Sequence, residues 1–332
     1  MTTHSDHQAR PRAVAALEAA ARAALHAPSV FNTQPWRWRV AGETLELYAD
    51  RDRALQATDP DGRLLMLSCG AALHHARVSL EAAGWTAHVE RLPDGGDTDL
   101  LARITVAENG PADRRAEQMA GAITSRRTDR RAFGDRAVPE ELLNELRRVV
   151  EAEGAYLHVV RRDQMPMLAT STARAADAEN KDPAYLAEIA RWTGRPEGSG
   201  DGVPAATAVQ QVPRRVPVRD YAPGGTAGLA AGEGFDVGAA YVVVFGLTDR
   251  PAEFLRGGEA LSALLLTATA EGLATAPLSD TIEVEWPRQL LRGLLADIGE
   301  PYLIVRLGYH DATTQLPEAP RRAPGDVIQV DE

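Results

Sequence analysis

Two continuous apolar runs constrain the fold of this chain more than any other feature. They are AAYVVVFGL at residues 239–247 and PYLIVRLGY at residues 301–309. Strands this apolar must be covered on both faces, so we expect them in the interior of the protein. Residues 36–40 (WRWRV) indicate a different kind of strand, because apolar and basic side chains alternate with the period of a half-buried strand.

Segments of helical and strand character alternate twice along the chain. The apolar period predicts helices at residues 13–26, 62–83, 113–125, 139–152, 163–178, 183–192, 251–272 and 286–297. Further strands are predicted at residues 45–49, 85–91, 100–107 and 155–160. Asn, Gly, Pro and Asp cluster at residues 108–113, which indicates a boundary there. The sequence therefore predicts an α+β fold in two parts, residues 11–110 and 111–332.

Residues 194–234 interrupt this pattern with many glycines and prolines and no sustained period. An irregular segment of this length inside a compact domain is a lid, a binding loop or disordered. Several apolar side chains favour the lid, since they give the segment something to bury. They are Val209, Val212, Val216, Val218 and Tyr221.

Composition excludes several classes of function. The chain has 332 residues, a formal net charge of −11 and a pI near 5.3, which argues against a nucleic-acid partner. We find no run of 18 or more apolar residues and no apolar signal segment in the first ten, so we expect a cytoplasmic protein without a membrane span. Cys69 is the single cysteine, which excludes an internal disulfide and a multi-cysteine metal site.

The segment APSVFNTQPW at residues 27–36 carries the first candidate site. A predicted helix ends there, because the residue before Pro28 is disfavoured in the helical region. Ser29, Asn32 and Gln34 offer both hydrogen-bond donors and acceptors, which suits a heteroaromatic ring with a mixed edge. The alternative is a plain turn in which Ser and Asn cap backbone groups.

Arginine-rich segments form the second candidate site. Residues 124–133 (TSRRTDRRAF) combine four arginines with hydroxyl side chains, and residues 320–324 (PRRAP) add two more arginines. Arginine provides forked donors for bidentate contact with phosphate. The alternative in both places is a solvated basic segment. Lys181 is the only lysine, so any phosphate site here must be built from arginine.

These motifs together resemble the nitroreductase superfamily of FMN enzymes. The resemblance rests on PS-x-x-N-x-QPW at 28–36, RR-T-x-R at 126–130, and LGY followed by PRR near the C-terminus. Their order is similar to that in the Acg-type FMN-binding proteins, which resemble a nitroreductase dimer fused into one chain. The resemblance covers nearly the whole chain except the first ten residues and the 194–234 loop. It implies a nitroreductase-like fold with two tandem related halves packed as a pseudo-dimer, and mixed or antiparallel sheets flanked by helices.

The resemblance implies three groups of FMN contacts. Contacts to the flavin ring are expected from Pro28, Ser29, Asn32 and, more weakly, Gln34. The phosphate and ribityl chain are expected to bind Arg126, Arg127, Thr128 and Arg130, supported by Arg321 or Arg322. The ring edge is expected to lie against Pro277, Leu278 and Ser279, in a loop that follows a long helix.

Each half of the chain lacks one of the two motifs. The second half has no PS-x-x-N segment, and the first half has no RR-T-x-R segment. The two half-sites are complementary, so we expect one FMN per chain and a monomer that acts as a pseudo-dimer. Further dimerisation is left open.

Two functions are compatible with such a site. In an NAD(P)H-dependent flavin oxidoreductase, NAD(P)H reduces the flavin and a small acceptor (a nitroaromatic, a quinone or an unsaturated bond) reoxidises it. No side chain of this chain is then needed as an acid or base. In a non-catalytic FMN storage or sequestration protein, the 194–234 loop covers the flavin and prevents turnover. A specialised biosynthetic flavoenzyme is a third hypothesis.

Overall fold

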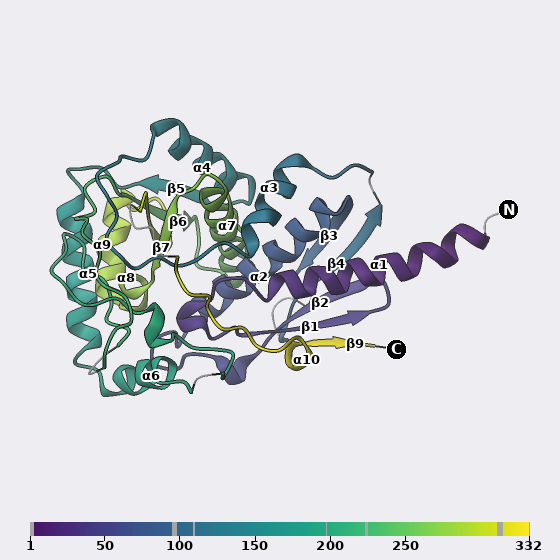
Figure 1. Ribbon diagram of the computed structural model, residues 1–332, viewed down its shortest axis with the longest axis horizontal. Coiled ribbons are helices and arrows are strands. Elements are labelled where there is room, and N and C mark those ends of the chain that lie inside the picture. The colour runs from purple at the N-terminus through teal and green to yellow at the C-terminus, as the bar shows by residue number, and fades with distance from the viewer. Residues whose placement is uncertain are drawn as a thin grey trace.

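The computed structural model describes residues 3–94, 98–108, 110–196, 198–222, 225–310 and 315–331. Within them, two sheets lie towards opposite ends of the long axis, with helices packed between and around them (Figure 1). The combination of helices with one mixed and one antiparallel sheet confirms the predicted α+β class. Among the described residues, we find no helix with the length and apolar character needed to cross a lipid bilayer.

The first sheet contains the half-buried strand predicted at residues 36–40. In spatial order its strands are β3 (Trp85–Arg91), β4 (Leu100–Glu108), β2 (Thr44–Ala49), β1 (Trp36–Ala41) and β9 (Ile328–Val330). Trp36, Trp38 and Val40 point into the core, whereas Arg37 and Arg39 are exposed. The helices α1 (Thr3–Ala24) and α2 (Arg63–Ala82) pack together and contact this sheet, which buries its apolar face.

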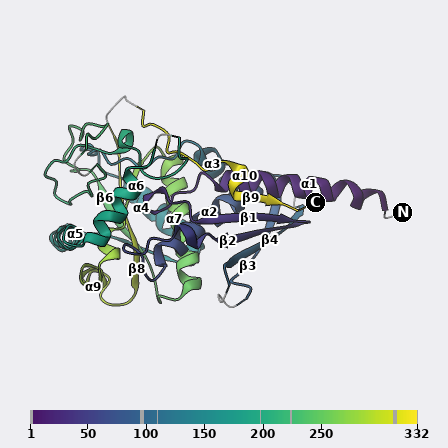
Figure 2. The ribbon, with the colours of Figure 1, turned by 90° about the horizontal axis from the view of Figure 1, so that it is seen from below.

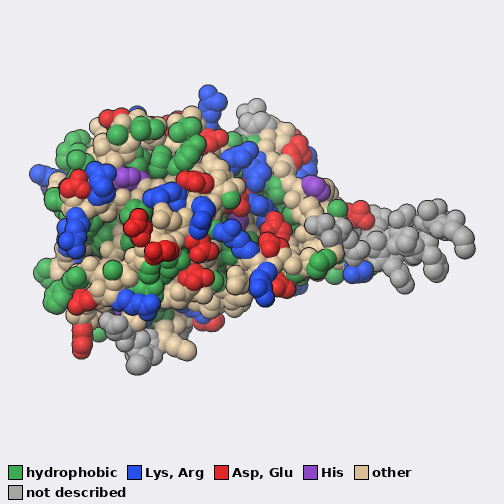
Figure 3. Space-filling model, turned by 90° about the horizontal axis from the view of Figure 1, so that it is seen from above, with side chains coloured by type: hydrophobic (Ala, Val, Ile, Leu, Met, Phe, Trp, Pro, Cys, Tyr) green, Lys and Arg blue, Asp and Glu red, His purple; other side chains and the backbone are tan. Residues whose placement is uncertain are grey.

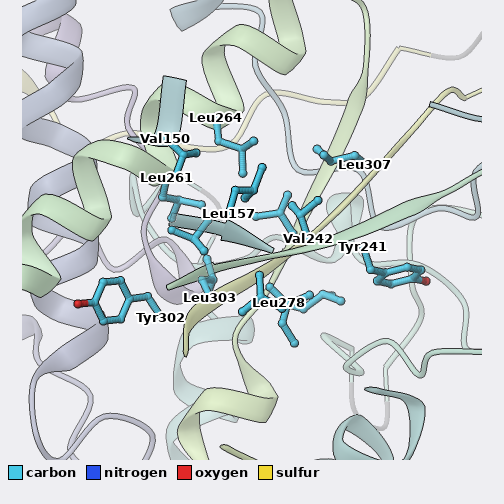
Figure 4. Close-up of a cluster of buried hydrophobic side chains, with 14 of the residues drawn as sticks. Val150, Leu157, Tyr241, Val242, Leu261, Leu264, Leu278, Tyr302, Leu303 and Leu307 are labelled. Carbon is cyan, nitrogen blue, oxygen red and sulfur yellow. The ribbon is translucent and has the colours of Figure 1, made fainter. Parts of the chain in front are cut away.

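The second sheet contains the two apolar runs. Its strands in spatial order are β5 (Tyr156–Val159), β6 (Ala240–Gly246), β8 (Glu300–Gly308) and β7 (Ala274–Leu278), all antiparallel. The central strands β6 and β8 are buried almost throughout, as predicted. Around this sheet lie α4 (Glu140–Ala152), α5 (Met165–Glu179), α7 (Pro251–Ala270) and α9 (Glu285–Leu294). Figure 4 shows the resulting core, in which Val242, Leu303 and Leu278 belong to one cluster.

Close packing of α2 against α7 joins the two parts of the chain. A Cβ atom added at Gly70 would overlap the carbonyl oxygen of Leu255, and one added at Gly258 would overlap that of Leu67. Only glycine allows the two backbones to approach so closely. The adjacent His74 and His75 are 2% and 0% exposed. Both bond to Ser262 of α7, since the partner helix covers them completely.

The segment that contains Pro277 and Leu278 differs from its predicted local structure. It was expected in a loop but forms β7, because it pairs with β8 at the edge of the second sheet, where Pro277 is tolerated. The C-terminal tail contains the short helix α10 (Pro324–Val327) before β9. The tail crosses from the second sheet to the first, where β9 pairs in parallel with β1 (Figure 1).

The remaining elements are short or lie at the edges of the fold. They are α3 (Arg114–Ile123), α6 (Pro183–Thr193), α8 (Asp280–Glu283) and the 3-10 turns η1 (Val30–Asn32), η2 (Arg51–Arg53) and η3 (Ala205–Thr207). Figure 2 shows that the 194–234 loop lies on the same side of the molecule as α6. Acidic and basic side chains are interspersed on the face seen in Figure 3.

Candidate functional site

A cavity of about 160 Å³ lies where segments from distant parts of the sequence meet. Its wall contains the following predicted site residues: Pro28, Ser29, Asn32, Arg126, Arg127, Thr128, Arg130, Pro277, Ser279 and Arg321. Leucines from α2, α7 and β8 provide an apolar part of the wall. A concave site with apolar walls and a few converging polar groups is typical of a small-molecule or cofactor site.

The loop that precedes β1 has an unusual backbone conformation. Phe31, Asn32 and Gln34 adopt positive φ angles of 49°, 54° and 50°. Residues other than glycine pay an energetic penalty in this region, and such strain is concentrated at functional sites. The Oγ atom of Ser29 accepts a 2.9 Å hydrogen bond from the backbone N–H of Gln34, which stabilises the turn.

The side chain of Asn32 joins three segments. Its Nδ2 donates to the carbonyl oxygens of Gly202 and Pro320, both at 3.0 Å, and its Oδ1 accepts a 2.6 Å hydrogen bond from Nη1 of Arg321. The 28–36 loop, the 194–234 loop and the C-terminal tail therefore meet at one amide. Protein groups occupy both of its donor hydrogens.

Three predicted site residues lie outside the cavity wall. Gln34 is fully buried, with Nε2 donating to the carbonyl oxygen of Gly200 at 2.8 Å and Oε1 accepting from the backbone N–H of Arg322 at 3.0 Å. The guanidinium of Arg322 bonds to Asp50 at 3.1 Å. Leu278 points into the core of the second sheet (Figure 4). Gln34 and Arg322 thus hold the tail in place behind the wall.

Three arginine side chains gather at one part of the wall. Arg126 is 4% exposed, and its Nε and Nη1 atoms have no hydrogen-bond partner among the described residues. Arg127 donates to the carbonyl oxygens of Thr124 and Arg126, and to Glu318 at 2.6 Å. Arg321 donates to the carbonyl oxygen of His26 at 3.0 Å. We call Arg126, Arg127 and Arg321 the arginine cluster.

Electrostatics show that the arginine cluster has too little negative charge nearby. Burial, followed by the charges of Arg321 and Arg127, lowers the pKa of Arg126 to about 9. Burial and Arg127 lower the pKa of Arg321 to about 10. Because an arginine guanidinium remains protonated in proteins, these shifts mean that an anion placed here would be strongly stabilised. The carboxylate of Glu318 is 84% exposed and offsets little of this charge.

The segment from Thr128 to Arg131 is held beside β7. The backbone N–H of Asp129 donates to the carbonyl oxygen of Thr275 at 2.8 Å. Arg306 of β8 is 1% exposed and donates to the carbonyl oxygens of Asp129 and Arg131. The sequence analysis did not select Arg306, although an arginine inside an apolar run was the available signal.

The 194–234 loop forms one side of the cavity. Val203, Pro204, Thr207 and Tyr221 line it, and the guanidinium of Arg130 lies 4.1 Å from the centre of the Tyr221 ring. Val209 and Val216 are buried, as expected for a lid. Val212 is 46% exposed, however, so the expectation that it is buried is wrong.

Other residues of the wall were not selected from the sequence. They include His26, Ser68, Thr124 and Glu318. Ser68 lies among small residues on α2, and its Oγ accepts from the backbone N–H of Val30 at 3.4 Å. In the sequence, only the small residues on this face of α2 indicate that another segment packs closely against the helix at Ser68.

Comparison with known proteins identifies relatives that match over nearly the full length of the chain. No protein-family model matches it. "Putative NAD(P)H nitroreductase Rv3131" of Mycobacterium tuberculosis H37Rv is 38% identical over 309 residues, which cover 92% of this chain and 89% of that protein. "Putative NAD(P)H nitroreductase acg" of the same strain is 36% identical over 318 residues, which cover 94% of each.

Solved structures resemble the chain more distantly. The crystal structure of the FMN-dependent nitroreductase NfnB from Mycobacterium smegmatis in complex with NADPH is 16% identical, with a TM-score of 0.41. The match covers 65% of this chain and 99% of that chain. The assignment follows from the sequence relatives, whose similarity extends over nearly the full length: the chain belongs to the Acg-type NAD(P)H nitroreductase family.

Proposed function

We propose that the cavity binds one FMN and that the protein is an FMN-dependent oxidoreductase that uses NAD(P)H. The observation that carries this proposal is Arg126, a buried cation in the cavity wall with unpartnered Nε and Nη1 atoms. Two further arginines lie beside it, so the cluster has an excess of positive charge that an anion would offset. The paired N–H donors of arginine match the oxygens of a phosphate monoester. The names of the relatives support the same chemistry, since two of them are described as NAD(P)H nitroreductases.

In this proposal, the arginine cluster holds the phosphate of FMN. Arg130 and Thr128 follow along the same wall and are placed to contact the ribityl chain. The isoalloxazine ring then lies against Pro28, Ser29 and the apolar wall, with Pro277 and Ser279 at its edge. Asn32 acts mainly by assembling the site, because its amide is engaged by protein groups.

When bound, FMN supplies the two-electron chemistry between NAD(P)H and a small acceptor such as a nitroaromatic or a quinone. The residues of this chain bind the cofactor, orient it and exclude water from it. The cavity wall contains residues from both proposed halves, 11–110 and 111–332, as expected for a single composite site. The stoichiometry that follows is one FMN per chain.

Titration with flavins tests the proposal. The purified protein is expected to carry a yellow chromophore, to bind one FMN per chain, and to bind riboflavin much more weakly because riboflavin lacks the phosphate. Anaerobic addition of NADPH or NADH should bleach the bound flavin, and a quinone should restore its colour. A colourless protein that binds neither flavin would contradict the proposal.

A second candidate function is FMN storage, and one observation favours it. Arg219 of the 194–234 loop is buried and paired with Glu179 of α5 and Glu283 of α8, which fastens the loop beside the cavity. A loop held in this way restricts the access of a second substrate. Bound FMN that is not bleached by either nicotinamide nucleotide would select storage over turnover.

A further inference from the structure

A buried group of carboxyl side chains lies next to the cavity. Nη2 of Arg219 donates to Oε1 of Glu179 at 3.0 Å and to Oε2 of Glu283 at 2.7 Å. Asp280, at the start of α8, belongs to the same group and is 3% exposed. We call Glu179, Asp280 and Glu283 the acid cluster.

The charges in the acid cluster do not balance. Asp59, Tyr185 and Tyr221 also act on the cluster and bring no positive charge. Arg130 and Arg306 line the space in front of Asp280, and Arg306 is itself paired with Asp236. Arg219 bonds to both Glu179 and Glu283 and can compensate only one of them, so the cluster retains a proton at neutral pH.

The shifts of two pKa values have the direction that an excess of negative charge requires, and they leave Glu179 as the group that holds the proton at neutral pH. Burial raises the pKa of Glu179 to about 8, and Glu283 and Asp280 contribute to the rise while Arg219 opposes it. Burial likewise raises the pKa of Asp280 to about 6, with Arg219 opposing and Glu283 contributing.

Several polar atoms of the same region have no partner among the described residues. They are Nε and Nη1 of Arg219 and the hydroxyl of Tyr185, all buried. Buried polar atoms in folded proteins bond to ordered water when no protein group is in reach. These atoms therefore indicate hydrated space around the acid cluster.

A side chamber lies beside two members of this region, Arg219 and Asp280. It measures about 10 Å³, which is roughly the room for one water molecule. Asp280 and Arg219 line it, and Arg130, Tyr221, Pro277 and Ser279 line both the side chamber and the main cavity. The side chamber thus lies between the acid cluster and the proposed flavin site.

We propose that the acid cluster donates the proton used in reduction at the main cavity, through a water in the side chamber, with Asp280 as the residue facing that water. This rests on the proposed function. A hydride equivalent from NAD(P)H (two electrons and one proton), passed to a quinone, leaves one oxyanion on the acceptor. The carboxyl O–H bond breaks, the acceptor O–H bond forms, and the remaining carboxylate is stabilised by Arg219. A proton from bulk solvent then restores the carboxyl group.

Infrared spectroscopy of the protein without flavin tests the stored proton. At pH 7 we expect the carbonyl stretch of a protonated, desolvated carboxyl group. Its intensity should fall in Glu179→Gln and should be unchanged in Asp163→Asn, a carboxyl-to-amide change at the surface. Absence of this stretch from the wild-type protein, or its full retention in Glu179→Gln, would overturn the proposal.

Kinetics of the flavin-loaded protein test the transfer. The rate of acceptor reduction should fall as pH rises, because the acid form is lost. Asp280→Asn should lower that rate by about 100-fold and flatten the pH profile, with FMN still bound. Retention of the wild-type profile in a folded, FMN-loaded Asp280→Asn variant would exclude the relay while leaving the proposed function intact. A wild-type protein that binds no FMN would instead remove the proposed function, and the infrared result would still report on the stored proton.

Discussion

Nη1 of Arg321 donates a 2.6 Å hydrogen bond to Oδ1 of Asn32, although 289 positions separate the two residues in the chain. The same guanidinium donates to the carbonyl oxygen of His26, which holds the C-terminal tail against the segment just before the 28–36 loop. One contact therefore both orients a cation of the arginine cluster and fixes a strained loop. Removal of either partner should affect cofactor binding and stability together.

Substitution of Asn32 by alanine tests this dual role. The change removes three hydrogen bonds and places alanine at a φ of 54°. We expect the free energy of unfolding to fall by about 1–3 kcal/mol and the affinity for FMN to fall at least about tenfold. Urea denaturation and fluorescence titration measure the two effects. Asn144→Ala on the exposed face of α4 is the control, and an Asn32 variant that behaves like it would disprove the role.

Replacement of Arg126 by methionine should separate binding from stability. Because the buried guanidinium has unpartnered atoms, we expect the protein without flavin to become more stable, by about 1 kcal/mol or more. Affinity for FMN should fall about 10- to 100-fold, whereas affinity for riboflavin should change little, since riboflavin has no phosphate. Thermal denaturation and parallel titrations with the two flavins provide the measurements. An equal loss for both flavins would show that Arg126 does not bind the phosphate.

Glycine-to-alanine substitutions test the contact between α2 and α7. Gly70→Ala places a methyl group against the backbone of Leu255, so we expect a loss of more than about 2 kcal/mol from the free energy of unfolding. Gly121→Ala on α3 meets no atom within 4 Å and should stabilise the protein by about 0.5–1 kcal/mol. Urea denaturation of both variants compares the positions directly. We expect the two substitutions to have opposite effects. If both instead stabilised the protein, the two helices would separate readily at Gly70.

The pH dependence of stability should depend on Glu179. Its pKa is raised from 4.5 to about 8 in the folded protein, so its stabilising contribution is complete below about pH 4.5 and is lost as pH rises through 8. His74 and His75 act in the opposite direction, because their lowered pKa values cost stability as pH falls below 6.5.

The difference between Glu179→Gln and the wild-type protein isolates the contribution of Glu179. Between pH 5 and pH 8, the free energy of unfolding should fall less steeply with pH in the variant than in the wild-type protein. The two slopes should differ by up to about 1.4 kcal/mol per pH unit. Urea denaturation across this range measures the slopes. Parallel curves for the two proteins would show that Glu179 does not take up a proton on folding.

Regular elements with a strong apolar period were predicted correctly from the sequence. The runs 239–247 and 301–309 form β6 and β8, and the alternation at 36–40 places Trp36 and Trp38 in the core. Segments without such a period were predicted less well. β7 contains Pro277 and depends on pairing with β8, while the burial of His74 and His75 depends on contact with α7. These features come from partners that are distant in sequence.

Consecutive residues are enough to predict the family, the α+β class and the residue types available for a phosphate site, because periodicity and short motifs are local in sequence. The tertiary structure establishes which of those residues meet. It brings Arg126, Arg127 and Arg321 to one wall, turns Gln34 and Arg322 behind it, and sends Leu278 into the core. It also collects Glu179, Asp280 and Glu283 around Arg219, a group that no motif indicates. The physical reason is that burial and pairing set the charge state of each group, and both depend on neighbours supplied by chain segments far apart in sequence.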